Sequence, residues 1–290
     1  MRPQRLVLLG LACLSASTLA ACGQASRGEV LSQAAQALPR VRSGSLDLRM
    51  AVSGGDAGQS GQVGFEERGP FSLPNPGGLP VANTEVIHFV GTQRESTRFI
   101  STGQDAFIGT GGQTYALPPA RVQALRQAST PVGGNLGGLP LDRWAVGGSV
   151  SDGGQLDGVA TDHVVSSVNV VQFVNDLMQL SRGLGQAASV PQVNAAEAQT
   201  LSRAVRSSHF EMWSGKDDHM VRKLVVSVDF AAPADPSGGL AKYSRSHLEL
   251  DLALTSVNQQ VRVDAPKGAQ PFSAFCTTQP EAGACKNTQS

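Results

Sequence analysis

Apolar and polar residues alternate most regularly in the last third of the chain. Four leucines separated by polar or small residues form one such stretch: Leu248, Leu250, Leu252 and Leu254. Two further alternating stretches flank a predicted turn at residues 215–218, namely Phe210 and Met212 before it and Leu224, Val226, Val228 and Phe230 after it. Because successive side chains of a strand point to opposite faces, this pattern predicts antiparallel strands with one covered and one solvated face.

After the N-terminal segment, residues 29–117 are predicted to form one helix followed by several strands. Apolar positions in residues 29–41 recur at helical intervals, which predicts a helix. Alternation over residues 46–52 predicts a strand, which the Gly-rich residues 53–61 end. The Pro- and Gly-rich residues 69–80 are expected to be a loop. Val63 and Phe65 begin a second predicted strand. Further strands are predicted over residues 85–91, 95–101, 104–109 and 114–117.

The middle of the chain mixes loops, strands and helices. A short helix is predicted over residues 121–128, and a second Gly/Pro-rich loop follows at 131–140. After Leu141-Asp142-Arg143-Trp144, strand signals return at residues 155–168.

Two more helices are predicted before the last strands. Asn169 stands where it can cap a helix over residues 170–182. Another helix is expected to start at Asn194, with Glu197 three residues later as in a capping box. Few helices must cover a long antiparallel sheet, so the sequence predicts one α+β domain.

The N-terminus has the parts of an export signal. Arg2 and Arg5 supply its positive region, and the apolar core at residues 6–14 is shorter than the roughly 20 apolar residues that span a bilayer. Leu19-Ala20-Ala21-Cys22 resembles the lipobox that lipoprotein signal peptidase cuts. Ordinary secretion, with the cysteine a bystander near the cleavage site, is the alternative.

The lipobox gives the expected ends of the mature chain. Residues 1–21 would be removed, Cys22 would be acylated, and residues 22–27 would form a short tether. We therefore expect a lipid-anchored protein on the extracytoplasmic face of the cell membrane, held close to that membrane.

Charge and cysteine content agree with this location. The chain has 23 basic and 23 acidic residues, which argues against binding to nucleic acid. Cys13 leaves with the signal, so Cys276 and Cys285 remain as a pair that could close a short loop in an oxidising compartment. Neither has a nearby histidine or a second cysteine pair, so we expect no metal site.

Catalytic signals are scarce in this sequence. No nucleophile elbow, phosphate loop or zinc-protease motif is present, and no cofactor is expected. Asp217, Asp218 and His219 could form an acidic site with a base, but a polar hairpin turn explains them better. Trp144 and Trp213 could stack on a ligand or could simply pack. His88 and His247 lie on the solvated side of their alternating strands.

A long antiparallel sheet with few helices can leave an apolar hollow between its layers. Such a hollow would favour an acyl chain by about 0.8 kcal/mol per buried CH₂ group. Alternatively, the same side chains pack against the helices and fill the core. The pattern of the sequence leaves both readings open.

The order of elements resembles the LppX/LprG-type lipoproteins of actinobacteria, which are related in fold to the LolA lipoprotein carrier. The resemblance is one of layout and hydrophobic pattern over most of residues 28–265. Three stretches carry it: Leu46-Asp-Leu-Arg-Met50, Leu156-Asp-Gly-Val-Ala-Thr-Asp-His163, and Phe210-Glu-Met-Trp213 with the turn that follows.

The resemblance implies a curved antiparallel β half-barrel with helices packed on its concave face, forming residues 28–275, with 276–290 as a C-terminal tail. It also implies an apolar cavity for acylated lipids and no catalytic residues. The cavity-wall candidates that it suggests are Leu48, Met50, Phe65, Phe89, Phe173, Leu177, Leu224 and Val228. The insertions at 69–80 and 131–140 depart from the family pattern and could reshape the mouth of the cavity.

We therefore expect a non-enzymatic lipoprotein that carries an apolar ligand, in particular an acylated lipid. The first alternative is a sensor or interaction module with a filled core, whose loops bind another envelope protein. The second is a cell-wall enzyme, for which residues 217–219 are the candidates.

Overall fold

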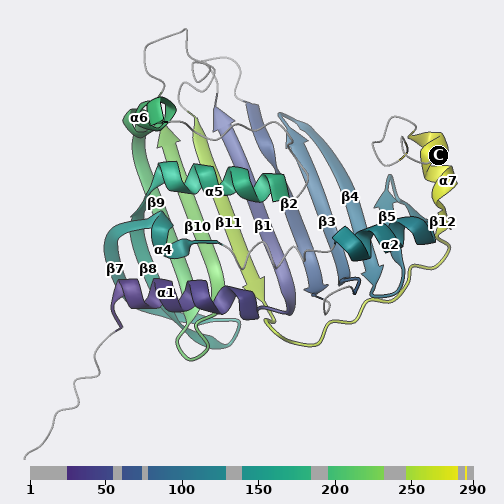
Figure 1. Cartoon of the computed structure of the whole chain (residues 1–290), viewed down its shortest axis with the longest axis horizontal. Helices are drawn as coiled ribbons and strands as arrows, with labels where there is room; N and C mark the ends of the chain where they lie inside the picture. The colour runs from purple at the N-terminus through teal and green to yellow at the C-terminus, as the bar shows by residue number, and fades with distance from the viewer. Residues whose placement is uncertain are drawn as a thin grey trace, which may run out of the picture.

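The structure is a computed structural model, and it describes residues 25–54, 61–73, 78–128, 139–183, 195–231, 246–279 and 285. Within these residues, twelve strands form one open sheet in the order β12-β6-β5-β4-β3-β2-β1-β11-β10-β9-β8-β7. All neighbours pair antiparallel except β12, which runs parallel to β6. The expected α+β half-barrel is therefore confirmed (Figure 1).

The strands follow the alternating stretches of the sequence. In chain order they are β1 (Ser43–Gly54), β2 (Gly61–Ser72), β3 (Val81–Val90), β4 (Gln93–Thr102), β5 (Ala106–Thr110), β6 (Gln113–Ala116), β7 (Ala145–Leu156), β8 (Val159–Val168), β9 (Val205–Gly215), β10 (Val221–Phe230), β11 (His247–Thr255) and β12 (Gln270–Pro271).

The helices lie across one face of this sheet or at its ends and edge. They are α1 (Arg27–Ala37), the 3₁₀ helix η1 (Leu38–Arg40), α2 (Pro119–Ala128), α4 (Leu141–Trp144), α5 (Val170–Gly183), α6 (Ala195–Ala204) and α7 (Phe272–Thr278). Figure 1 shows α1, α4 and α5 in front of the strands from β7 to β1, with α2 in front of β4 and β5.

Local capping explains where two of the helices begin. Ser26 Oγ accepts a hydrogen bond of 3.3 Å from the backbone N–H of Glu29 and starts α1. Asn169 Oδ1 accepts one of 3.3 Å from the backbone N–H of Gln172, which confirms the predicted cap of α5. Asn194, the predicted start of the next helix, lies outside the described residues, and α6 begins at Ala195.

The prediction of a loop throughout residues 69–80 was wrong at its start, because β2 continues to Ser72. Pro70 pairs with Ser45 of β1, while the ladder to β3 passes from the Arg68–Glu85 pair directly to the Phe71–Ala82 pair. A proline is tolerated where one side of a strand makes no ladder hydrogen bond. Most of the predicted loop at 131–140 lies outside the described residues.

Most of strand β7 was not predicted from the sequence. β7 begins at Ala145, whereas the sequence pattern predicts a strand only from residue 155. Its register against β8 shifts between Val146 and Ser149 and again between Asp152 and Gln155. These bulges break the alternation of apolar and polar residues, so the sequence pattern does not show the strand.

The largest core fills the space between the helices and strands β8, β9, β10, β11 and β1. Trp144 of α4 and Phe173 of α5 are both fully buried there, with an edge-to-face contact of 5.0 Å between ring centroids. The indole N–H of Trp144 donates a 2.8 Å hydrogen bond to Asp176. Of the two roles considered for Trp144, packing is the one observed.

Candidate functional site

Strand register decides which side chains share the concave face. Leu48 pairs with Leu252 on one side and Glu67 on the other, and Met50 pairs with Leu250 and Phe65. Directly paired residues of an antiparallel ladder project to the same face. The concave face therefore brings together three of the predicted cavity-wall residues: Leu48, Met50 and Phe65. All three are half-buried.

Four other predicted wall residues are buried where α5 packs against the sheet. Phe173 and Leu177 of α5 are 0% and 8% exposed, and Leu224 and Val228 of β10 are each 1% exposed. All four belong to one continuous apolar cluster. At this end of the concave face, sheet and helix side chains fill the space between them. This part of the chain agrees with the reading in which the same residues form a packed core.

Phe89 does not belong to the concave face, which corrects its assignment as a cavity-wall residue. It pairs with Gly64, which pairs with Ala51, and all three face the convex side. There the ring lies close to Gly64 and between two guanidinium groups, 5.0 Å from Arg49 and 5.4 Å from Arg94. Cation–π contacts and the missing glycine side chain account for its burial at 2% exposure.

Coverage of the concave face falls across the sheet. We call β8, β9, β10 and β11 the covered strands and β2 and β3 the open strands. On the covered strands, Phe210 and Val226 are fully buried. On the open strands, Val63 and Val90 form a pair that is 53% and 60% exposed. The apolar surface thus continues from a filled core to partly exposed positions.

Glu67 is a residue that the sequence reasoning missed. Its pairing with Leu48 and Val86 places it on the concave face, among apolar side chains. Burial raises the pKa of Glu67, while a hydrogen bond from the hydroxyl group of Thr84 opposes that rise. The signal was available, because Glu67 stands two residues after Phe65 and so must share its face.

Asp217, Asp218 and His219 lie in the turn between β9 and β10, as the favoured prediction of a polar hairpin turn expects. Asp218 accepts a 3.0 Å hydrogen bond from the backbone N–H of Met220 and a 2.5 Å bond from the buried guanidinium of Arg222. Its backbone oxygen accepts a 3.1 Å bond from Arg40. His219 adopts a positive φ of 59°, which fits a tight turn. These contacts favour the turn over an acid–base pair.

The remaining histidines lie on strand surfaces. His163 stacks on Trp213 with ring centroids 4.1 Å apart, so this tryptophan also packs within the protein. His163 and His209 contact the two carboxylate oxygens of Glu211 at 2.8 Å and 2.5 Å. Burial raises the pKa of Glu211, but these hydrogen bonds outweigh it and leave the pKa lowered.

His88 and His247 occupy different faces. His247 lies on the convex side and contacts Asp229 at 2.8 Å. His88 is exposed as predicted, yet it lies on the concave face, with its ring 6.4 Å from that of Phe65. Across the described part of the chain, no three His, Cys, Asp or Glu side chains are grouped to hold a metal ion.

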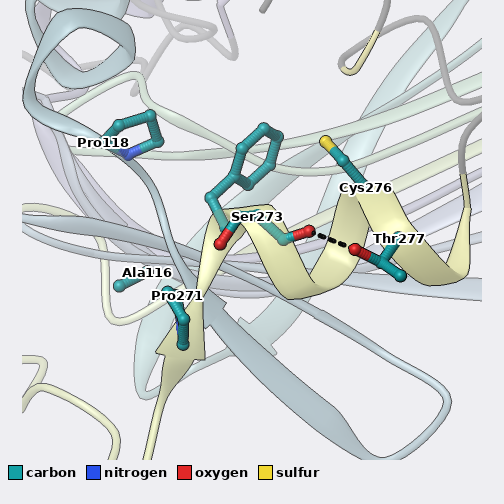
Figure 2. A pocket seen from close by; sticks show the side chains of 7 residues that line it. Ala116, Pro118, Pro271, Ser273, Cys276 and Thr277 are labelled. Carbon is teal, nitrogen blue, oxygen red and sulfur yellow. Dashed lines mark hydrogen bonds between the residues drawn. The ribbon is translucent and has the colours of Figure 1, made fainter.

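A pocket lies at the other edge of the sheet, beside the disulfide. Cys276 in α7 is bonded to Cys285, which is buried against Tyr115, Phe272 and Phe275. The boundary expected before residue 276 thus falls within α7. Figure 2 shows Pro118 on one side of the pocket and α7 residues on the other; the hydroxyl of Thr277 donates a 3.0 Å hydrogen bond to the Ser273 carbonyl.

This pocket has a volume of about 700 Å³. Its lining residues are Ala116, Pro118, Pro271, Phe272, Ser273, Cys276 and Thr277. None of these lining side chains is charged, and the guanidinium of Arg121 lies 5.2 Å from the ring centroid of Phe272. The cavity-wall candidates named from the sequence lie elsewhere: seven on the concave face or in the core beside it, and Phe89 on the convex face.

The predicted lipid anchor and signal belong to the N-terminal end of the chain. The signal at residues 1–21, Cys22 and the first part of the tether at 22–27 lie outside the described residues. No helix among the residues described is long and apolar enough to cross a membrane.

No protein-family model and no curated protein sequence matches this chain. Several solved structures align with it, including the following two. LprF from Mycobacterium bovis aligns over 83% of this chain and 97% of its own, at 12% sequence identity and a TM-score of 0.39. A LolA superfamily protein from Nitrosomonas europaea aligns over 84% of this chain and 96% of its own, at 9% identity and a TM-score of 0.20.

Proposed function

We propose that this chain is a non-enzymatic lipoprotein that binds an acylated lipid against the concave face of its sheet. It is anchored through Cys22 to the extracytoplasmic face of the cell membrane. One observation carries the proposal: the concave face stays apolar from the filled core to Leu48, Met50 and Phe65, which are only partly covered. Soluble proteins rarely leave such a surface open without a binding role.

Binding would work by burial. An acyl chain that lies along Leu48, Met50 and Phe65 gains about 0.8 kcal/mol for each CH₂ group removed from water. Phe173, Leu177, Leu224 and Val228 form the inner end of the site, where α5 meets β10. To enter there, an acyl chain would have to replace contacts between α5 and the sheet with its own contacts. Longer acyl chains would therefore require α5 to shift.

The short tether fits exchange with a membrane. The helix α1 begins at Arg27 after its cap at Ser26, so the five residues from Cys22 to Ser26 can reach only about 18 Å at roughly 3.5 Å per residue. A lipid could then pass between the bilayer and the protein over a short distance.

Photolabelling would test the proposal. The full chain, reconstituted in vesicles, is irradiated with a diacylglycerol that carries a diazirine on one acyl chain, and the labelled peptides are identified by mass spectrometry. We expect labelling of peptides from β1, β2 and α5. Met50→Asp should reduce it about tenfold or more, because a charge on the site disfavours an acyl chain.

A matched variant controls for the added charge. Val146→Asp introduces the same carboxylate at an apolar residue that is 53% exposed on the edge strand β7, away from the site. It should leave labelling unchanged. Absence of labelling on β1, β2 and α5 in the unaltered chain would overturn the proposal and favour an interaction module with a filled core.

A further inference from the structure

Two adjacent glutamates on β2 have opposite surroundings. Glu66 is 4% exposed on the convex face and forms ion pairs with Arg49, Arg68 at 3.2 Å and Arg94 at 3.7 Å. Glu67 points to the concave face and forms no ion pair with any residue that the structure describes. Its polar contact is the hydroxyl of Thr84, itself only 6% exposed.

The rest of the concave face around Glu67 offers it no compensating charge. Register places Leu48 and Val86 on either side of it, and Phe65 precedes it on the same strand face. A carboxyl group among apolar side chains is unfavourable unless its hydrogen-bonding capacity is used. Thr84 uses part of that capacity, and a carboxyl group can accept several further bonds.

Charge is divided between the two faces of β1, β2, β3 and β4. Their arginines, Arg49, Arg68, Arg94 and Arg98, all project to the convex face. On the concave face, the ionisable residues of these four strands are Glu67, His88 and Glu95. His88 pairs with Glu95 nearer the β3–β4 turn, and both are exposed. An anionic headgroup would therefore find no Lys or Arg of these four strands on their concave face.

We propose that Glu67 is the specificity-determining residue of the lipid site: its carboxyl group, with the hydroxyl of Thr84, hydrogen-bonds an uncharged, hydroxyl-bearing headgroup and disfavours an anionic one. This rests on the function proposed above. Because burial raises the pKa of Glu67, the carboxyl group is more easily protonated than usual. Whether protonated or ionised, it can bond to a hydroxyl group, whereas the ionised form repels a phosphate.

Three probes with the same acyl chains separate the hydrogen bond to a hydroxyl group from the repulsion of an anionic group. They are dioleoylglycerol with a free hydroxyl, the same molecule with that hydroxyl acetylated, and dioleoyl phosphatidic acid. Their binding to the full chain in detergent is measured by competition for the photolabelled site. The unaltered protein should bind the free-hydroxyl lipid about tenfold more tightly than either of the other two, a ratio expected from one hydrogen bond to a partly buried carboxyl group.

Two variants of Glu67 then assign that preference. Glu67→Leu should abolish the preference for the free hydroxyl over the acetate while keeping acyl-chain binding. Glu67→Gln keeps the shape and a hydrogen-bonding group, so it should retain the hydroxyl preference and bind phosphatidic acid more tightly than the unaltered chain does. The control is Glu95→Gln, which makes the same change at an exposed position of the same face and should alter neither ratio. Circular dichroism and thermal melting confirm that each variant is folded.

The outcomes distinguish the two proposals. If no probe binds the unaltered chain, the lipid-binding function itself fails. If all three probes bind equally, or if the hydroxyl preference survives in Glu67→Leu, the lipid site stands and the role of Glu67 is overturned.

Discussion

The covered and open strands are parts of one sheet with the same alternation, yet they differ in what lies above them. On the covered strands, Phe210 and Val226 are fully buried against helices. On the open strands, Phe65 is half-buried and Val63 is 53% exposed. The apolar side chains of a strand therefore determine only that this face is better removed from water. The position of the helices determines whether other parts of the protein cover it or leave it accessible to a ligand.

The largest test of this comparison is a pair of identical substitutions on one face. Phe210→Ala should lower the free energy of unfolding by about 3–5 kcal/mol, because it leaves a cavity in a filled core. Phe65→Ala should lower it by only about 1 kcal/mol, since that ring is half-buried in the unliganded protein. Urea denaturation of both variants measures the two values. Equal losses would mean that the open strands are packed as tightly as the covered ones.

A smaller effect should separate the two faces of β2. Glu66→Gln leaves the three arginines around it without their shared carboxylate, and we expect it to lower the free energy of unfolding by about 2–3 kcal/mol, less than for a fully buried pair because the arginines are partly exposed. Glu67→Gln should change stability by less than about 0.5 kcal/mol or increase it, because no ion pair is lost. The same denaturation experiment at neutral pH compares them. A larger loss for Glu67→Gln would contradict the assignment of faces.

The smallest expected effect is a difference in pH dependence. Hydrogen bonds from Ser207 and His247 lower the pKa of Asp229 below its usual 3.8, so its contribution to stability is present above that pH and is lost as the pH falls through its folded-state pKa. Burial raises the pKa of Glu67 above 4.5, so its protonated form stabilises the fold at low pH and that contribution is lost as the pH rises through the raised pKa.

Comparing each variant with the unaltered chain between about pH 3 and pH 7 isolates these contributions. The advantage of the unaltered chain over Asp229→Asn should shrink toward acid pH, and its stability relative to Glu67→Gln should fall as the pH rises. Parallel profiles for the two variants would show that the carboxyl groups have similar surroundings.

Much of the fold could be predicted because its signals are local. The alternation at Leu248, Leu250, Leu252 and Leu254 gave β11 correctly, and the cap at Asn169 gave the start of α5. Where the signal is not local, prediction failed. Most of strand β7 was not predicted, because its bulges disturb the period of two. Pro70 was predicted to lie in a loop, because its place in β2 depends on how β2 pairs with β3.

The candidate site shows the same division. The shared face of Leu48, Met50 and Phe65 could be predicted because each stands on an apolar phase of its strand. Phe89 was misplaced because both phases of β3 contain apolar residues, Ile87 and Phe89 on one and Val86 and Val90 on the other. Pairing with Gly64 and contact with Arg49 decide its face, and both involve other strands.

The sequence by itself determined the class of fold, the alternating faces of the strands and most of the helices, because side-chain period and capping act over a few residues. Tertiary structure alone decided which face is concave, which part of it the helices fill, and how the adjacent Glu66 and Glu67 differ. Those properties depend on register between strands far apart in the chain. A shift of one residue would exchange every side chain between the two faces.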